Sequence, residues 1–456
     1  MEIFKNDIVE GIIEKQGNSG EGVLRIGNYP VFLDYGLPGE KVRAKVLRAN
    51  KTHGFGKIIE IEEASPMRIE PPCPYYYDCG GCSLQHQNYE GQLDFKKQRV
   101  TECMERIAGI KEPKVEKTIG MANPWNYRNK SQMPLGVNKN GEATVGFYAK
   151  RSHRIIDIKE CMIQNKESDL VSGIVRGWMN EFKIPVYDPE KESTKSRARS
   201  ILTRKGFSTN EVMVVLTATD TEIPNLNTMV DKLKAINGMR SIILNINNSK
   251  TNTFMGNQNV TLWGEDKIID TIGDLKFSIS PNSFFQVNPV QTEQIYGKVL
   301  ELAKLTGNET VLDLYCGTGT IALSLAKHAK QVYGVETVPQ AIEDAKANAT
   351  LNNIENATFI EGKSEEVIFD LLNKGIKPDL IVVDPPRKGC DESLLKAIAD
   401  SGTNNMIYVS CDPATLARDM QILKNYGFIE QTIHPIDNFP QTYHVETVVL
   451  ITRDNK

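Results

Sequence analysis

Two short segments near the end of the chain carry side chains that suit covalent catalysis. Ser410-Cys411-Asp412-Pro413 offers a thiol nucleophile, and His444-Val445-Glu446 offers a carboxylate base. Both follow a glycine-rich loop of the kind that binds cofactors. A thiol beside a bound cofactor suggests a covalent intermediate, and the carboxylate suggests that a proton must leave afterwards. Cys411 and Glu446 are therefore the candidate catalytic residues.

The glycine-rich loop, Asp313-Leu314-Tyr315-Cys316-Gly317-Thr318-Gly319-Thr320, directly follows an apolar run. Its glycines let the backbone approach a ligand closely, and Glu336, after the next run, is placed to take two ribose hydroxyls. This spacing fits both NAD and S-adenosylmethionine, so the loop alone leaves an oxidoreductase and a methyltransferase open. Asp384-Pro385-Pro386-Arg387, after a later run, resembles the motif of S-adenosylmethionine-dependent methyltransferases acting on nucleobases or amides, and it favours the second.

The chain divides into three expected domains. Residues 271–456 alternate continuous apolar runs with helical patterns, which predicts a doubly wound, Rossmann-like α/β sheet buried on both faces. Residues 1–64 contain five short β-type runs, typical of an OB-like barrel that grips single-stranded nucleic acid, although a barrel for protein contacts fits the pattern equally. Residues 65–270 predict a central α+β domain. A helix near residue 95 could pack on either neighbouring domain.

Four cysteines of the central segment form a candidate metal site: Cys73, Cys79, Cys82 and Cys161. Cys79-Gly80-Gly81-Cys82 is a tight turn that lets two sulfurs reach one metal. Spacing alone suits zinc and a [4Fe-4S] cluster equally, and free reduced cysteines are the alternative. Of the remaining cysteines, Cys316 is expected to serve packing, and Cys103 and Cys390 receive no role.

Composition predicts a cytoplasmic protein without a membrane span. Hydrophobic residues make up 40% of the 456 residues and charged residues 25%, and neither a signal peptide nor a long apolar run is evident. The net charge of −4 does not indicate a nucleic-acid partner, but local basic patches favour binding to RNA or DNA. These patches are Arg43, Lys45, Arg48 and Lys51; Lys150, Arg151, His153 and Arg154; and Lys195, Arg197, Arg199, Arg204 and Lys205.

Together with Phe284-Phe285-Gln286-Val287-Asn288, the motifs above resemble the RNA uracil-5-methyltransferases. The N-terminal stretch resembles the TRAM domain, and with the cysteine loop the resemblance is to the 23S ribosomal RNA branch. It implies that Cys411 is the nucleophile and Glu446 the base. It also implies a [4Fe-4S] cluster on the four cysteines, with a structural or RNA-positioning role. The candidate S-adenosylmethionine-binding residues are Gln286, Tyr315, Gly317, Glu336 and Asp384.

This chemistry requires a uridine that is flipped out or lies in a loop, and we expect a lowered pKa for the Cys411 thiol. The expected partner is 23S rRNA, and the expected state is a monomer. Three alternatives remain: a transfer-RNA methylase, a non-catalytic RNA-binding ribosome-assembly factor, and an NAD-dependent oxidoreductase. The resemblance departs at Thr320 and Lys363, near which family members often carry Asn.

Overall fold

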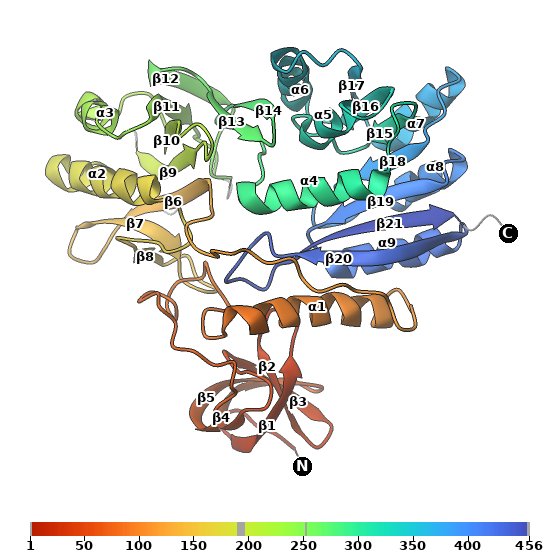
Figure 1. The fold of residues 1–456 in the computed structure, drawn as a ribbon. Coiled ribbons are helices and arrows are strands. Elements are labelled where there is room, and N and C mark those ends of the chain that lie inside the picture. The colour runs from red at the N-terminus through yellow and green to blue at the C-terminus, as the bar shows by residue number, and fades with distance from the viewer. Residues whose placement is uncertain (1, 189–196, 251–252, 454–456) are drawn as a thin grey trace.

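The computed structural model describes residues 2–188, 197–250 and 253–453, so Lys195 of the third basic patch lies outside the described residues. A small barrel, a central sheet and a larger sheet follow one another along the chain, and Figure 1 shows the barrel set apart below the two sheets. Among the described residues, no helix is long and apolar enough to cross a membrane.

The N-terminal part is a closed five-stranded barrel with the strand order β1-β2-β3-β5-β4. Alternating side chains such as Val31, Leu33 and Val42 fill its interior, as the period of two in a strand requires. The predicted barrel is therefore confirmed. Its strands are β1 (Ile8–Gln16), β2 (Gly22–Ile26), β3 (Tyr29–Asp34), β4 (Lys41–Ala49) and β5 (Gly54–Glu63).

The central part is a seven-stranded sheet with the order β12-β11-β10-β9-β6-β7-β8. Helix α3 links the parallel strands β10 and β11, and α2 packs against β7 and β9. The predicted α+β character is confirmed. The elements are β6 (Lys130–Val137), β7 (Ala143–Tyr148), β8 (Ile155–Asp157), α2 (Lys166–Phe182), β9 (Ala198–Lys205), β10 (Val212–Ala218), α3 (Leu226–Lys234), β11 (Met239–Ile246) and β12 (Gln258–Gly264).

The C-terminal part is a second seven-stranded sheet with the order β17-β16-β15-β18-β19-β21-β20. The first five strands are parallel, and β21 and β20 add antiparallel to them. Helices cover both faces, as the apolar runs predicted; β20 was not predicted. The elements are β15 (Thr310–Asp313), α5 (Thr320–Ala326), β16 (Gln331–Glu336), α6 (Pro339–Leu351), β17 (Ala357–Glu361), α7 (Ser364–Asn373), β18 (Leu380–Val383), α8 (Glu392–Asp400), β19 (Asn405–Ser410), α9 (Pro413–Lys424), β20 (Phe428–Ile436) and β21 (Glu446–Arg453).

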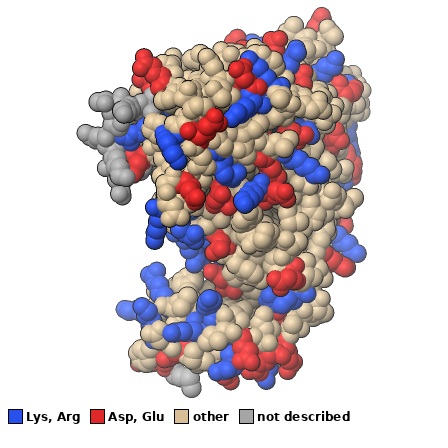
Figure 2. All heavy atoms as spheres, turned by 90° about the vertical axis from the view of Figure 1, so that its left-hand side faces the viewer, with Lys and Arg blue, Asp and Glu red and all other residues tan. Residues whose placement is uncertain are grey.

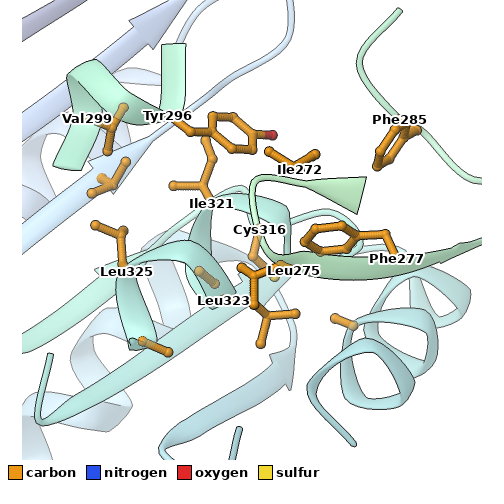
Figure 3. Close-up of a cluster of buried hydrophobic side chains, with 14 of the residues drawn as sticks. Ile272, Leu275, Phe277, Phe285, Tyr296, Val299, Cys316, Ile321, Leu323 and Leu325 are labelled. Carbon is orange, nitrogen blue, oxygen red and sulfur yellow. The ribbon is translucent and has the colours of Figure 1, made fainter. Parts of the chain in front are cut away.

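A hairpin, β13 (Ile268–Ile272) and β14 (Leu275–Ile279), precedes helix α4 (Pro289–Ala303) and the second sheet. Figure 3 shows Leu275 and Phe277 of the hairpin close to Cys316 and Leu323, in one apolar cluster with Tyr296 of α4. Cys316 is buried in this cluster, as expected for a packing residue.

Helix α1 (Tyr89–Arg106) packs on α9 and β20 of the second sheet. Its buried residues Val100, Cys103 and Met104 belong to the same hydrophobic core as the sheet strands β18 and β19. The helix begins at Asn88, whose side chain accepts a hydrogen bond from Gly91 N. Figure 1 shows α1 lying between the barrel and the second sheet. The sequence could not tell which neighbouring domain this helix packs on, because the helix lies in the central segment of the chain.

Candidate active site

A cavity of about 790 Å³ opens at the carboxyl ends of β15, β16, β18 and β19. Open α/β sheets bind their ligands at this edge, because loops from successive parallel strands converge there. All seven residues predicted for catalysis or cofactor binding line this one cavity: Gln286, Tyr315, Gly317, Glu336, Asp384, Cys411 and Glu446.

The loop after β15 leaves room for a ligand. Gly317 and Gly319 have φ angles of 51° and 85°, which favour glycine. A Cβ on Gly317 would meet nothing within 4 Å, whereas one on Gly319 would press against Phe359 at 3.1 Å. Gly317 therefore faces open space, and Gly319 permits close packing of the loop. Glu336, at the end of β16, is held by hydrogen bonds that its Oε1 accepts from the backbone N atoms of Thr337 and Val338, at 2.7 and 3.0 Å.

Buried carboxyl groups at this edge of the sheet favour the binding of a cationic ligand. Burial raises the pKa of Asp384 to about 7. Burial also raises the pKa of Asp313 to about 7, with Asp384 and Glu336 adding repulsion. Asp313 Oδ2 is buried and has no hydrogen-bond partner in the described part of the chain. Because uncompensated negative charge is costly in a buried site, a positively charged ligand is stabilised there. A methyl sulfonium with an amino group has the required charge, so these residues fit S-adenosylmethionine.

Cys411 lies directly after β19, where Asp412 caps helix α9 by accepting a hydrogen bond from Ala414 N at 2.9 Å. Burial raises the pKa of the Cys411 thiol to about 12, and the negative charges of Glu446 and Asp384 raise it further, whereas Arg387 lowers it. The expectation of a lowered thiol pKa is therefore wrong for the protein without its substrates. The sequence predicted the thiol and both carboxyl groups as site residues, but not that burial and these charges would raise the pKa of the thiol.

Glu446 begins β21, on the strand next to Cys411, because Ser410 pairs with Thr447 in the β19–β21 register. Burial raises the pKa of Glu446 to about 8, and Asp384 adds to this rise. A hydrogen bond from Asn438 and the charge of Arg387 act in the opposite direction. A carboxyl group with a pKa near 8 is suited to exchange a proton near neutral pH.

The aromatic side chains that line the cavity include Phe284, Phe439 and His444. Phe284 is 71% exposed. The His444 ring lies 4.2 Å from the ring of Tyr443, and burial lowers the pKa of His444 to about 3, so this imidazole is neutral. Flat, uncharged walls suit stacking with a planar base. From the sequence, these three residues had no assigned role, because only their position in or near the predicted motifs linked them to the site. Thr320 and Lys363 line the same cavity.

The four predicted cysteine ligands line a second cavity, of about 200 Å³. Cys73, Cys79 and Cys82 come from the loop before α1, and Cys161 comes from the loop before α2. Within residues 2–188, 197–250 and 253–453, however, no three His, Cys, Asp or Glu side chains are grouped closely enough to hold a metal ion as they stand. The structure thus gathers the four soft donors around one space without forming a ready coordination shell.

The loop of this second cavity contacts the first site. Ser83 N and Leu84 N, which follow Cys82, both donate hydrogen bonds to Gln441 O, at 2.9 and 3.0 Å. Tyr443 N donates to Ser83 Oγ at 3.0 Å. Gln441 and Tyr443 belong to the loop that joins β20 to β21 and carries Phe439 and His444. The cysteine loop therefore supports one wall of the active-site cavity.

Basic side chains gather on both sides of a notch between the barrel and the rest of the molecule (Figure 2). The turn between β7 and β8 contacts the barrel here, since Lys150 pairs with Asp34 at 2.9 Å. In the third predicted patch, Arg197 and Arg204 are buried, so the prediction that both form a solvent-facing basic surface is wrong. Arg204 instead donates hydrogen bonds to Pro281 O and Ser283 O, beside the segment that carries Gln286.

Comparisons with known proteins agree with this architecture. Residues 271–454 match the family model of tRNA (uracil-5-)-methyltransferases, and residues 5–59 match the TRAM domain. An uncharacterized RNA methyltransferase from Clostridium tetani is 48% identical, over 99% of this chain and 97% of that protein. Another from Halalkalibacterium halodurans is 48% identical, over 99% of this chain and 98% of that protein.

One solved structure matches over almost the whole length. It is a Pyrococcus abyssi tRNA (uracil-54, C5)-methyltransferase in complex with S-adenosyl-L-homocysteine. The TM-score is 0.77 at 30% sequence identity, with 97% of this chain and 100% of that chain covered.

Proposed function

Because this chain belongs to the TRAM-containing RNA uracil-5-methyltransferases, we propose that its S-adenosylmethionine-dependent activity methylates uridine C5 in 23S rRNA. The observation that carries the proposal is the meeting of the Cys411 thiol and the Glu446 carboxyl group in the cavity that also contains the cofactor loop. We also propose that the enzyme acts as a monomer in the cytoplasm, which is the compartment where it would meet ribosomal RNA.

Cys411 provides the nucleophile that uracil C5 needs. In our proposal the Cys411 thiol first loses its proton to solvent, and the thiolate sulfur then adds to C6 of the uracil. The electrons of the C5–C6 double bond move toward O4. The enolate formed is nucleophilic at C5, which then takes the methyl group. S-adenosylmethionine supplies that group as a methyl sulfonium, and its departing sulfur keeps the bonding electron pair. Arg387 favours the first step because its charge stabilises the thiolate.

Glu446 completes the reaction. The methylated adduct still carries a proton on C5, and the carboxylate of Glu446 removes it. The C–H electrons then restore the C5–C6 double bond and expel the sulfur of Cys411. Because the pKa of Glu446 lies near 8, the resting group is mostly protonated at neutral pH and must ionise before it acts. Phe439 and His444 are the proposed stacking walls for the flipped base.

Gln286, Tyr315, Gly317, Glu336 and Asp384 are the proposed contacts for the methyl donor. Glu336 would accept from the ribose hydroxyls, as its fixed carboxylate at the end of β16 permits. Asp384 and the neighbouring carboxyl groups would stabilise the positive charge of the donor.

We propose that Cys73, Cys79, Cys82 and Cys161 hold a [4Fe-4S] cluster with a structural role. The support is their common cavity and their soft thiolate chemistry. The cluster would fix the loop whose Ser83 and Leu84 support Gln441. Iron and sulfide content of the anaerobically purified protein, with Cys79→Ser as comparison, tests this assignment independently of activity.

Transfer RNA is a second candidate substrate, favoured by the Pyrococcus abyssi enzyme. That tRNA methyltransferase covers 97% of this chain, so the barrel and the cysteine segment do not by themselves argue for ribosomal RNA. Purified protein should be incubated with labelled S-adenosylmethionine and either unmodified 23S rRNA or tRNA, followed by nucleoside analysis. 5-Methyluridine only in 23S rRNA supports the proposal, and label only in tRNA supports the second candidate. Cofactor binding without label in either RNA favours a non-catalytic role.

A further inference from the structure

The loop between β20 and β21 is held in place by buried polar contacts from helix α1. The Lys96 ammonium and the Asp437 carboxylate form a fully buried ion pair. Tyr89 Oη also donates to Asp437 Oδ2, at 2.8 Å, and Lys96 donates to Phe439 O, at 3.0 Å. The two residues on either side of Asn438 are therefore fixed by the same helix.

The rest of the loop is tied to α1 in the same way. Gln92 donates to Gln441 Oε1 at 3.0 Å and accepts from Gln441 N at 3.1 Å. Arg99 donates to Tyr443 O at 3.0 Å. Such contacts specify one backbone conformation, because each buried polar atom would lose its partner if the loop moved.

Asn438 sits at the centre of this anchored segment and is fully buried. Its backbone O accepts a hydrogen bond from Asn288 Nδ2 at 3.1 Å. Its own side-chain amide donates to Gln286 Oε1 at 3.4 Å. Asn438 also follows Ile436, which pairs with Glu446 in the sheet, and its amide lowers the pKa of that carboxyl group. Among the described residues, Asn438 Oδ1 has no hydrogen-bond partner, so this amide contacts its neighbours through its donor end. One side chain thus joins a proposed donor-binding residue to the proposed base.

We propose that Asn438 is a positioning residue, which holds the Glu446 carboxylate toward C5 of the uracil and Gln286 toward the methyl donor. This inference rests on the proposed function. Asn438 does not line the active-site cavity, so it acts through its two neighbours. Its sequence signal was absent, since it lies outside each motif that suggested chemistry.

The contact has a consequence for pH dependence. Asp384 raises the pKa of Glu446, and Arg387 and the amide of Asn438 lower it. Cys411 and Tyr296 also face the carboxyl group, and both remain protonated near neutral pH. Loss of the amide donor removes one stabiliser of the carboxylate. The pKa of Glu446 then rises above its present value of about 8, and the ionised base forms only at higher pH.

The test compares Asn438→Ala and the similarly sized, uncharged Asn438→Leu with the wild-type protein. Asn245→Ala is the matched control, because Asn245 is also fully buried and donates to Gly256 O and Gln258 O, in the central sheet. Single-turnover formation of 5-methyluridine is measured from pH 6 to 10. The acid limb should move up by about one to two pH units in both Asn438 variants, because a hydrogen bond to a charged group changes ionisation about ten- to hundredfold. Activity should recover at alkaline pH, with the Asn245 profile unmoved along the pH axis.

Profiles of both Asn438 variants that overlay the wild type, or that fall equally at every pH, would overturn the positioning role. If Asn438→Ala does not fold, Asn438→Leu decides, since it keeps the approximate size of the side chain and removes the donor without adding a charge. Failure of the proposed function is a different result, since the wild-type protein itself would then give no 5-methyluridine in any RNA, and both proposals would fall.

Discussion

The Cys411 thiol of the free protein should resist alkylation near neutral pH. Its pKa is raised from an ordinary value of 9.0 to about 12, with burial as the largest cause. A rise of three units means about a thousandfold less thiolate at pH 7.5 than an ordinary cysteine carries. Since the thiolate is the species that reacts, alkylation should slow by about the same factor.

Two variants separate the charges that act on this thiol. Glu446→Gln removes a negative neighbour and should raise the alkylation rate above pH 9, where Glu446 is ionised. Arg387→Ala removes the positive neighbour and should lower it. Each neighbouring charge is worth about one to three pKa units at close range. The matched control is Lys396→Ala, which deletes an exposed cation that pairs with Asp400 on α8.

The assay is time-resolved labelling by iodoacetamide, with mass spectrometry of the Cys411 peptide at each pH. A labelling midpoint at or below pH 9 in the free protein would refute the reasoning, since burial would then not govern the thiol. So would two variants that change the rate in the same direction. A confirmed high pKa would mean that the thiol is activated only once its substrates are in place.

Three further predictions concern the base, the helix and the barrel. Glu446→Gln should leave the RNA covalently attached, seen as a complex that survives denaturant. Wild-type turnover should rise as the pH passes through about 8, because Glu446 ionises there. Lys96→Met leaves the Asp437 carboxylate buried without its cation and should destabilise the folded protein by about 3–5 kcal/mol. The double variant with Lys96→Met and Asp437→Asn should recover most of this loss, as measured by thermal unfolding. Phe55→Ala, which removes a ring 5.7 Å from Phe32 on the barrel, should weaken single-stranded RNA binding by about 1–3 kcal/mol in a titration. Arg43→Ala should change it less, because Glu10 and Glu60 already pair with this guanidinium at 2.8 and 2.9 Å.

The candidate site residues could be predicted from sequence to lie together, because their positions follow from a simple rule. Asp384 and Cys411 each come directly after an apolar run, and the carboxyl ends of parallel strands meet at one edge. Their convergence on one cavity therefore follows once the order of the strands in the sheet is known. The positions of Lys96 and Asn438 could not be found in this way. Lys96 contacts Asp437, 341 positions away, and Asn438 contacts Gln286, 152 positions away, and only the folded protein brings these residues together. The pKa of Cys411 also depends on Glu446 of β21 and on Asp384 and Arg387 of the loop after β18.

The buried pair of Lys96 and Asp437 also bears on how the barrel is joined to the cavity. Replacement of a buried ion pair by a hydrophobic pair of similar volume is often neutral or stabilising, so we expect these charges to contribute a fixed geometry rather than stability. Helix α1, which carries Lys96, reaches the barrel on its other side, since Glu102 pairs with Lys15 at 2.8 Å. Gln87, just before the helix, donates to Gln16 of β1 at 3.3 Å. One helix therefore holds both the barrel and the loop that leads to Glu446, and it sets their separation in a way that a flexible linker could not.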